Sequence, residues 1–194
     1  MCPLRLDHTQ IFVPDVATQA KFYGELGFRL SEYITAEPNN DMIGAFMQVK
    51  GNPHDIVFLQ APGPQIHHTA FTVPEASHLM HVGDLLCEAG FFDSVEWGPI
   101  RHWGPGWARS LYLRDPDGHR LEFFTNHYQM IDLEEEPVAW SIDQLMAAPG
   151  WGPKPPETWM IEAIPFVGVS PHEPEDADAQ IGFSGLNNDD TKGS

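Results

Sequence analysis

The sequence predicts an α+β protein in which two βαβββ modules share one partly closed, mixed β-barrel. The first observation is a repeat: a strand-like run, a Val-Pro-acid tripeptide and an amphipathic stretch occupy residues 5–26 and return at 66–90. The second is that three further strand-like runs, separated by turn-forming residues, follow each copy. Two modules that each leave one sheet face uncovered can bury both faces by packing together.

The first module is expected to span residues 4–62. Residues 5–13 predict a strand, and Pro14-Asp15 opens a helix that ends at Gly27. The apolar face of this helix consists of Val16, Ala20, Tyr23 and Leu26. Turn-rich segments then separate three predicted strands, at 29–35, 43–50 and 54–60.

The second module is expected to span residues 63–128, and its register follows from the repeat. His8-Thr9 precedes Val13-Pro14-Asp15, and His68-Thr69 precedes Val73-Pro74-Glu75, at a constant offset of 60 residues. A strand at 66–73 therefore leads into a helix that ends near Gly90. Three strands follow, at 93–97, 109–114 and 119–125. Equivalent positions of the two modules should face one cavity.

The remaining chain divides into an arm and a tail. Residues 129–168 contain a short helical segment at 143–148 and a Trp, Pro and Gly-rich stretch, and we expect this arm to pack on the paired modules. Residues 169–194 are rich in Pro, Asp, Gly and Asn, which predicts a disordered acidic tail.

Charge and composition exclude several classes of partner. The chain has 28 acidic and 10 basic residues, a formal net charge of −18, which argues against nucleic acid and anionic membranes as partners. No apolar run approaches the roughly 20 residues of a membrane span. Cys2 and Cys87 do not form a disulfide framework, and Cys87 is expected in a helix core. The N-terminal residues lack a secretory signal pattern, which predicts a cytoplasmic protein.

The segment 111–124 predicts a β-hairpin that carries a carboxylate inward. Asp115-Pro-Asp-Gly118 supplies the turn, and Glu122 lies within an apolar run. A buried carboxylate must be paired or bound to a metal, because an unpaired buried charge is costly. A three-residue loop, Pro116–Gly118, would place Tyr112 opposite Glu122, whereas a four-residue loop would turn Tyr112 away.

His8, His68 and Glu122 are the candidate metal ligands. A single histidine in a strand is more often a structural residue, but the repeat places two of them at equivalent sites. Two imidazoles and one carboxylate form the facial triad of non-haem Fe(II) enzymes, Mn(II) fits the same ligands, and zinc is less natural. His67 alternates with His68 along the strand and is expected to point to the opposite face.

The chain from Leu4 to Trp159 resembles the catalytic module pair of the type I extradiol ring-cleaving dioxygenases, in the vicinal oxygen chelate superfamily. The segments that carry the resemblance are Leu6-Asp-His8, Ile66-His-His68, Gly98-Pro-Ile-Arg-His102 and Leu111–Glu122. The resemblance implies that His8, His68 and Glu122 bind Fe(II) or Mn(II). It further implies that His54, His102 and Tyr112 handle protons and oxygen, and it favours the hairpin register with Tyr112 opposite Glu122.

The implied reaction is extradiol cleavage of a catechol-type diol by O2, in the degradation of aromatic compounds. The resemblance is to smaller, single-domain members, and a homo-oligomer is expected to cover exposed area. Two alternatives stay open: a metal-dependent isomerase, lyase or thiol transferase on the same scaffold, and a non-catalytic small-molecule binding protein. The catechol itself is not specified, and His78, His81, His127 and His172 have no predicted role.

Overall fold

The computed structural model describes residues 3–132, 134–148 and 150–174. The first module consists of β1 (Arg5–Val13), α1 (Val16–Glu25), β2 (Arg29–Ala36), β3 (Asp41–Gln48) and β4 (Ile56–Gln60). The second consists of β5 (Gln65–Thr72), α2 (Ala76–Glu88), a 3-10 turn (Phe92–Ser94), β6 (Val95–Arg101), β7 (Arg109–Arg114) and β8 (Arg120–Thr125). The arm contains β9 (Val138–Ser141), α3 (Ile142–Ala147), α4 (Glu157–Ile161) and β10 (Ile164–Pro165).

Both βαβββ modules are present, with two differences from the sequence prediction. The strand expected at 93–97 begins at Val95 and continues to Arg101, because the chain makes a 3-10 turn first and then pairs with β7 through two register shifts. The strand expected at 54–60 begins at Ile56, so His54 lies in the loop before β4. His54 can therefore reach the concave side of the sheet without following strand alternation.

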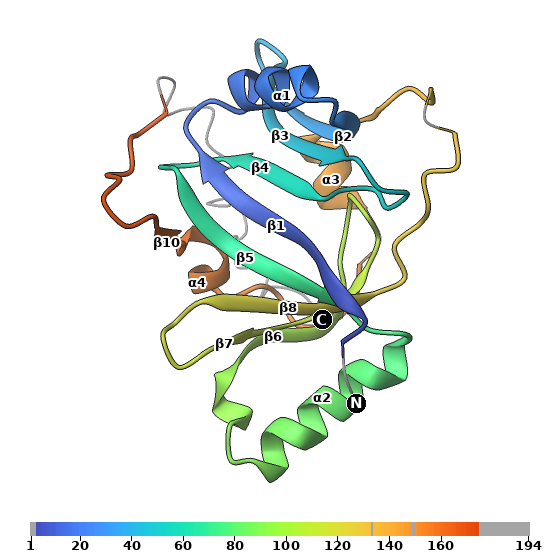
Figure 1. Ribbon diagram of the computed structural model, residues 1–194, viewed down its shortest axis with the longest axis vertical. Coiled ribbons are helices and arrows are strands. Elements are labelled where there is room, and N and C mark those ends of the chain that lie inside the picture. Colours follow the sequence, from blue (N-terminus) through green and yellow to red (C-terminus); the bar gives the residue numbers. More distant parts are fainter. Residues whose placement is uncertain (1–2, 133, 149, 175–194) are drawn as a thin grey trace, which may run out of the picture.

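The ten strands form one mixed sheet in the order β6-β7-β8-β5-β1-β4-β3-β2-β9, with β10 paired to β5. The two modules are mirrored in this order, since β1 pairs with β4 and β5 with β8, both parallel. The antiparallel pair β1 and β5 joins the modules and runs side by side through the middle of the molecule (Figure 1). The sheet is curled and does not close, as expected for a partly closed barrel.

Side-chain alternation divides each strand between a helix and the concave side of the sheet. In the first module, Ala45, Met47 and Phe58 pack in one cluster with Val16 of α1. In the second, Leu111 and Leu113 pack with Leu79 and Val82 of α2. Helices α1 and α2 lie at opposite ends of the molecule in Figure 1. The intervening residues of the same strands face the opposite, concave side.

The arm completes this concave side. Its strand β9 adds a parallel neighbour to β2, and β10 pairs with β5. Leu145 of α3 packs with Ile34 and Phe46, and Trp159 of α4 packs with Trp97. The sequence predicted α3 at 143–148 but not β9, β10 or α4, because segments this short carry almost no periodic pattern. The predicted tail, 169–194, falls mostly on residues 175–194, which lie outside the described residues.

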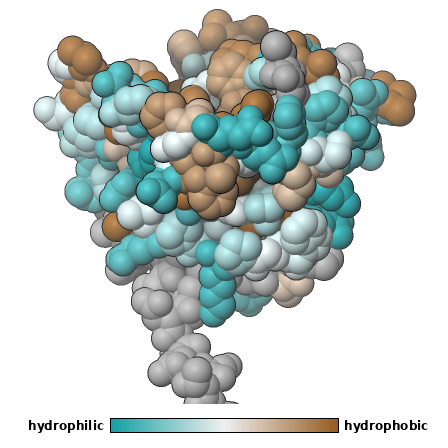
Figure 2. Space-filling view, turned by 90° about the horizontal axis from the view of Figure 1, so that it is seen from below, coloured by the Kyte–Doolittle hydropathy of each residue, from teal (hydrophilic) through white to brown (hydrophobic). Residues whose placement is uncertain are grey.

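One residue predicted in a helix core lies on the surface, and several apolar side chains are exposed. Cys87 is exposed, so its predicted place in the helix core is wrong; the buried face of α2 is formed by Leu79 and Val82. Leu4 and Leu6 are 61% and 56% exposed. Seen from below, groups of hydrophobic side chains alternate with hydrophilic ones (Figure 2). Within the described residues, no helix has the length and apolarity needed to cross a membrane.

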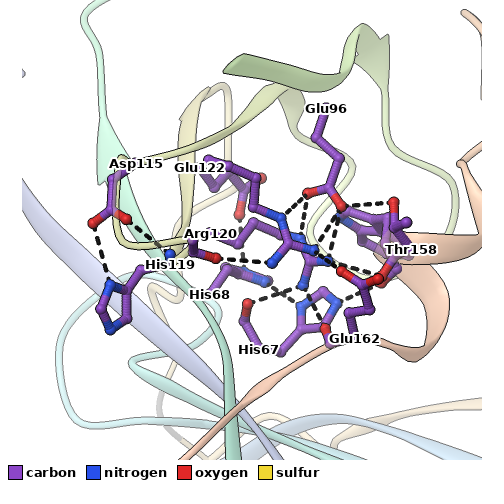
Figure 3. A network of polar contacts seen from close by, with 12 residues as sticks. His67, His68, Glu96, Asp115, His119, Arg120, Glu122, Thr158 and Glu162 are labelled. Carbon is purple, nitrogen blue, oxygen red and sulfur yellow. Dashed lines mark hydrogen bonds and ion pairs between the residues drawn. The ribbon is translucent and has the colours of Figure 1, made fainter. Parts of the chain in front are cut away.

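The side chain of Arg120 is the centre of a buried polar network (Figure 3). Its Nε and Nη2 atoms donate to the carboxylate of Glu96 on β6, at 2.6 and 3.0 Å. Its remaining hydrogen bonds go to the carbonyl oxygens of His67, Thr158 and Glu162, each at 3.0 Å. One guanidinium thus ties β8 to β5, β6 and the arm.

We expect Arg120→Met to lower the free energy of unfolding by at least about 3 kcal/mol, because a buried carboxylate loses its main partner and three carbonyls lose their donor. Urea denaturation measures the change. Arg29→Met is the matched control: Arg29 pairs with Glu134 on the surface at 3.0 Å, and exposed pairs contribute about 1 kcal/mol or less. Equal losses in the two variants would show that the network does not stabilise the fold.

Candidate metal centre and cavity

The concave side of the sheet holds a cavity of about 270 Å³ that is lined by both modules and by the arm. All six residues singled out in the sequence line it: His8, His54, His68, His102, Tyr112 and Glu122. They come from β1, the loop before β4, β5, the loop after β6, β7 and β8. The fold therefore brings together residues that are spread over more than half of the chain.

His8, His68 and Glu122 converge at the buried end of this cavity. The Nε2 atoms of His8 and His68 are 3.4 Å apart. The Oε2 atom of Glu122 lies 3.4 Å from His8 Nε2 and 3.1 Å from His68 Nε2. Each of the three side chains is at most 5% exposed. Three potential ligand atoms thus form a nearly equilateral triangle.

This triangle fits a first-row divalent cation. Ligands about 2.1 Å from an ion lie about 3.0 Å apart in cis positions of an octahedron and about 3.4 Å apart in a tetrahedron. The observed 3.1 to 3.4 Å edges match one face of either polyhedron. Two imidazoles and one carboxylate could hold Fe(II) or Mn(II) and leave the positions on the cavity side free.

Two β-bulges place a supporting residue beside each histidine of the triangle. The register of β1 and β5 shifts at Asp7 and again at His67, so each of these residues is extra on its strand. Asp7 Oδ2 lies 3.1 Å from Nδ1 of His8, and His67 Nδ1 lies 2.7 Å from Nδ1 of His68. The prediction that His67 points to the opposite face from His68 is wrong, because the bulge interrupts strand alternation and both rings line the cavity.

The hydrogen bonds of His67 fix the tautomer of His68. Nε2 of His67 lies 2.7 Å from the carbonyl oxygen of Trp159, which can only accept, so this nitrogen carries a proton. Burial holds the pKa of His67 well below its usual value, so the ring is neutral and its Nδ1 is an acceptor. His68 must then donate from Nδ1, which leaves a lone pair on Nε2 at the triangle.

The charges at the triangle favour a cation. Burial acts to raise the pKa of Glu122, but His68 and His8 outweigh it and hold the pKa well below the usual value. Burial lowers the pKa of His68 to about 4 despite the neighbouring Glu122. Burial also acts to lower the pKa of His8, yet Asp7 and Glu122 raise it. A divalent ion at the triangle would therefore meet an anionic carboxylate and an unprotonated His68, and would displace any proton on His8.

His54, His102 and Tyr112 surround the triangle. The ring centroids of His54 and His8 are 4.4 Å apart. Nδ1 of His54 has no hydrogen-bond partner among the described residues, and burial holds the pKa of His54 well below the usual value. Nδ1 of His102 lies 2.7 Å from the carbonyl oxygen of Trp103 and donates to it. Burial lowers the pKa of His102, so the ring is neutral and its Nε2 is an acceptor. Burial and Glu122 raise the pKa of Tyr112, which remains a donor.

The predicted hairpin register is confirmed. Asp115 pairs with His119 through a 2.9 Å backbone hydrogen bond, which leaves Pro116–Gly118 as a three-residue loop. Gly118 adopts φ +88°, a conformation that glycine tolerates without strain. Tyr112 is consequently the cross-strand partner of Glu122.

Sequence reasoning missed two residues at the cavity, His127 and Glu32. His127 lines the cavity with its ring 4.7 Å from that of His54, and His8, His54 and His127 form a second group able to hold a metal. Burial lowers its pKa to about 3, so it is neutral. It lies just after β8, where it follows no repeat and has no equivalent in the first module, so no sequence pattern marked it.

Glu32 supports the rim of the cavity from β2. Its carboxylate accepts hydrogen bonds from Gly106 N at 3.0 Å, from the Tyr128 hydroxyl at 2.6 Å and from Trp140 Nε1 at 2.7 Å. Burial raises its pKa. A charged residue within the strand-like run 29–35 was the available signal.

We expect His67→Leu to weaken the binding of Mn(II) about 10- to 100-fold, because the Nδ1–H of His68 loses its acceptor and the ring its fixed orientation. Competition with a chelator measures the dissociation constant. His67→Gln, whose amide oxygen can accept the same hydrogen bond, should recover most of the affinity. Wild-type affinity in a folded His67→Leu protein would contradict a role for His67 in orienting His68.

Comparison with known proteins agrees with this geometry. The sequence model of the Glyoxalase/Bleomycin resistance protein/Dioxygenase superfamily matches residues 5–123. A manganese-dependent 2,3-dihydroxybiphenyl 1,2-dioxygenase from Geobacillus genomosp. 3 is 31% identical over 161 residues, which cover 79% of this chain and 50% of that protein.

Solved structures give the same relationship. The anaerobic complex of homoprotocatechuate 2,3-dioxygenase from Brevibacterium fuscum with 3,4-dihydroxyphenylacetate is 32% identical, with a TM-score of 0.75 over 84% of this chain and 50% of that chain. A variant of this enzyme in complex with HPCA gives a TM-score of 0.79 at 30% identity, over 90% of this chain and 49% of that chain.

The chain spans about half the length of these relatives. Its homologues are extradiol dioxygenases, and the match to the superfamily covers both modules. The chain therefore belongs to the Glyoxalase/Bleomycin resistance protein/Dioxygenase superfamily, also known as the vicinal oxygen chelate superfamily.

Proposed function

We propose that the chain catalyses the extradiol cleavage of a catechol-type aromatic diol by O2, in the degradation of aromatic compounds. Fe(II) or Mn(II) would be held by the Nε2 atoms of His8 and His68 and by the carboxylate of Glu122. The observation that carries this proposal is the triangle of three ligand atoms, with edges of 3.1 to 3.4 Å, at the closed end of a cavity. The extradiol dioxygenases among the homologues support the same reaction.

When bound, the ion supplies Lewis acidity toward the two diol oxygens and the redox chemistry that O2 requires. The protein supplies the proton transfers. His54 is neutral and lines the cavity, so its ring can accept a proton from a diol hydroxyl. In the product, the ring carbon–carbon bond beside the diol is broken and both atoms of O2 are retained.

Tyr112 and His102 would act on the oxygen side of the reaction. Tyr112 keeps its proton at neutral pH and can donate a hydrogen bond to developing negative charge. Neutral His102 offers an acceptor at Nε2, because its Nδ1 is engaged with Trp103. His102 therefore takes up a proton before it can donate one.

Oxygen uptake after anaerobic reconstitution with Fe(II) or Mn(II) tests this function. Catechol and 2,3-dihydroxybiphenyl should each be tried, with uptake and a yellow ring-opened product as the expected results. Glu122→Ala should lose both metal and uptake, since the triangle loses its anion. Glu88→Ala, an exposed carboxylate on α2, is the matched control and should retain both. One equivalent of bound metal without oxygen uptake would replace this proposal by the isomerase, lyase or thiol transferase class.

We expect His54→Gln to lower kcat/KM about 10²- to 10⁴-fold while one equivalent of metal still binds. Burial lowers the pKa of His54, so the basic form persists below the ordinary histidine value of about 6.5. The acid limb of the wild-type pH–rate profile should thus lie below about pH 6.5 and disappear in the variant. His81→Gln, at an exposed position on α2, is the control. An unchanged rate for His54→Gln would remove His54 from the reaction.

We also propose a cytoplasmic location, a homo-oligomeric state and a division of the chain into residues 1–128, 129–168 and 169–194. Sedimentation of the metal-loaded protein addresses the second of these.

A further inference from the structure

The cavity has a polar end and an apolar remainder. Its histidines, Tyr112 and Glu122 gather around the triangle. The wall formed by the first module and α3 consists of apolar side chains: Ile34, Phe46, Val57, Leu59 and Leu145. Opposite this wall, α4 contributes Trp159, Met160 and Ile161. A ring held at the triangle would therefore direct its substituents between two apolar surfaces.

Among the residues that the structure describes, no Lys or Arg side chain lines this cavity. The nearest buried cation, Arg120, is not available: all five of its N–H groups are directed to Glu96 and to three backbone carbonyl oxygens. The guanidinium of Arg101 lies 4.9 Å from the ring centroid of Trp107 and outside the lining. An anionic group in the cavity would find no counter-charge there.

The exposure of the lining residues indicates that the cavity opens beside α4. Ile161, at 66% exposed, is the lining residue most open to solvent. Gln60, Ala61 and Pro62 line the facing side and are half-buried. A substituent that extends away from the triangle would pass Gln60, whose neutral amide is the polar side chain at this opening.

We propose that this cavity selects diols whose ring substituent is uncharged and apolar, and that it discriminates against diols whose substituent carries a carboxylate. This inference rests on the proposed function, because the triangle must hold the metal that binds the diol. A carboxylate in the cavity would be desolvated without a counter-charge, since the unpartnered amide of Gln10, which also lines the cavity, is neutral.

Binding of a matched pair of ligands tests the proposal without turnover. The pair is 3,4-dihydroxyphenylacetate and its methyl ester, which differ in charge but hardly in shape. Calorimetric titration of the Mn(II)-loaded protein, without oxygen, gives both dissociation constants. About 0.15 M salt screens the overall negative charge of the protein, since the Debye length is then about 8 Å. We expect the ester to bind at least about tenfold more tightly than the acid.

Equal affinity, tighter binding of the acid, or binding of neither compound would overturn the proposal. Oxygen uptake is measured separately with both compounds. Selective binding of the ester without uptake would leave the selectivity in place and reject the dioxygenase function. Uptake with the acid at the same kcat/KM as the ester would confirm the function and reject the selectivity.

A charge introduced at the opening gives a second measurement. Gln60→Arg should bring the affinities of acid and ester to within about twofold, because the new cation pairs with the carboxylate. Gln60→Met, of similar length and uncharged, should keep the wild-type ratio. If Gln60→Arg also keeps that ratio, charge at the opening does not determine selectivity and the proposal fails. Neither variant alters a residue of the triangle or of its proton-transfer groups.

Discussion

The antiparallel pairing of β1 with β5 is the interaction on which the rest of the structure depends. It joins the two modules, because β1 continues the sheet through β4, β3 and β2, and β5 continues it through β8, β7 and β6. It also brings the equivalent histidines of the repeat together, with the Nε2 atoms of His8 and His68 3.4 Å apart. The parallel pairing of β8 with β5 then delivers Glu122 opposite Ala70. A two-fold repeat thus produces one site with three potential ligands, since only one module contributes a carboxylate.

The same repeat has diverged in how it supports its two histidines. Asp7 and His67 occupy equivalent bulge positions, and each contacts Nδ1 of the histidine that follows it. The Asp7 carboxylate raises the basicity of His8, whereas neutral His67 fixes the tautomer of His68 without adding charge. His67 in turn is bound by the carbonyl of Trp159. The orientation of one ligand therefore depends on the arm, which lies outside the repeat.

Two buried charged groups attach that arm to the sheet. Arg120 binds the carbonyl oxygens of Thr158 and Glu162 beside α4. Glu32 accepts hydrogen bonds from Trp140 of β9 and from the rim of the cavity at Gly106. Because both groups are satisfied within the protein, neither offers charge to a ligand. The arm consequently contributes apolar wall to the cavity.

The sequence alone determined the two modules and predicted the candidate ligand trio, because a repeat of 60 residues and an acid within an apolar hairpin are local, periodic signals. The reaction class was predicted only through the family resemblance. The same resemblance predicted His54, His102 and Tyr112. Only the tertiary structure decided the features that depend on irregular backbone or on contacts between segments far apart in the sequence. The bulge at His67 reversed the expected alternation, His127 entered the cavity without any repeat to mark it, and β9 and α4 formed only because the curled sheet offered them edges and apolar surface.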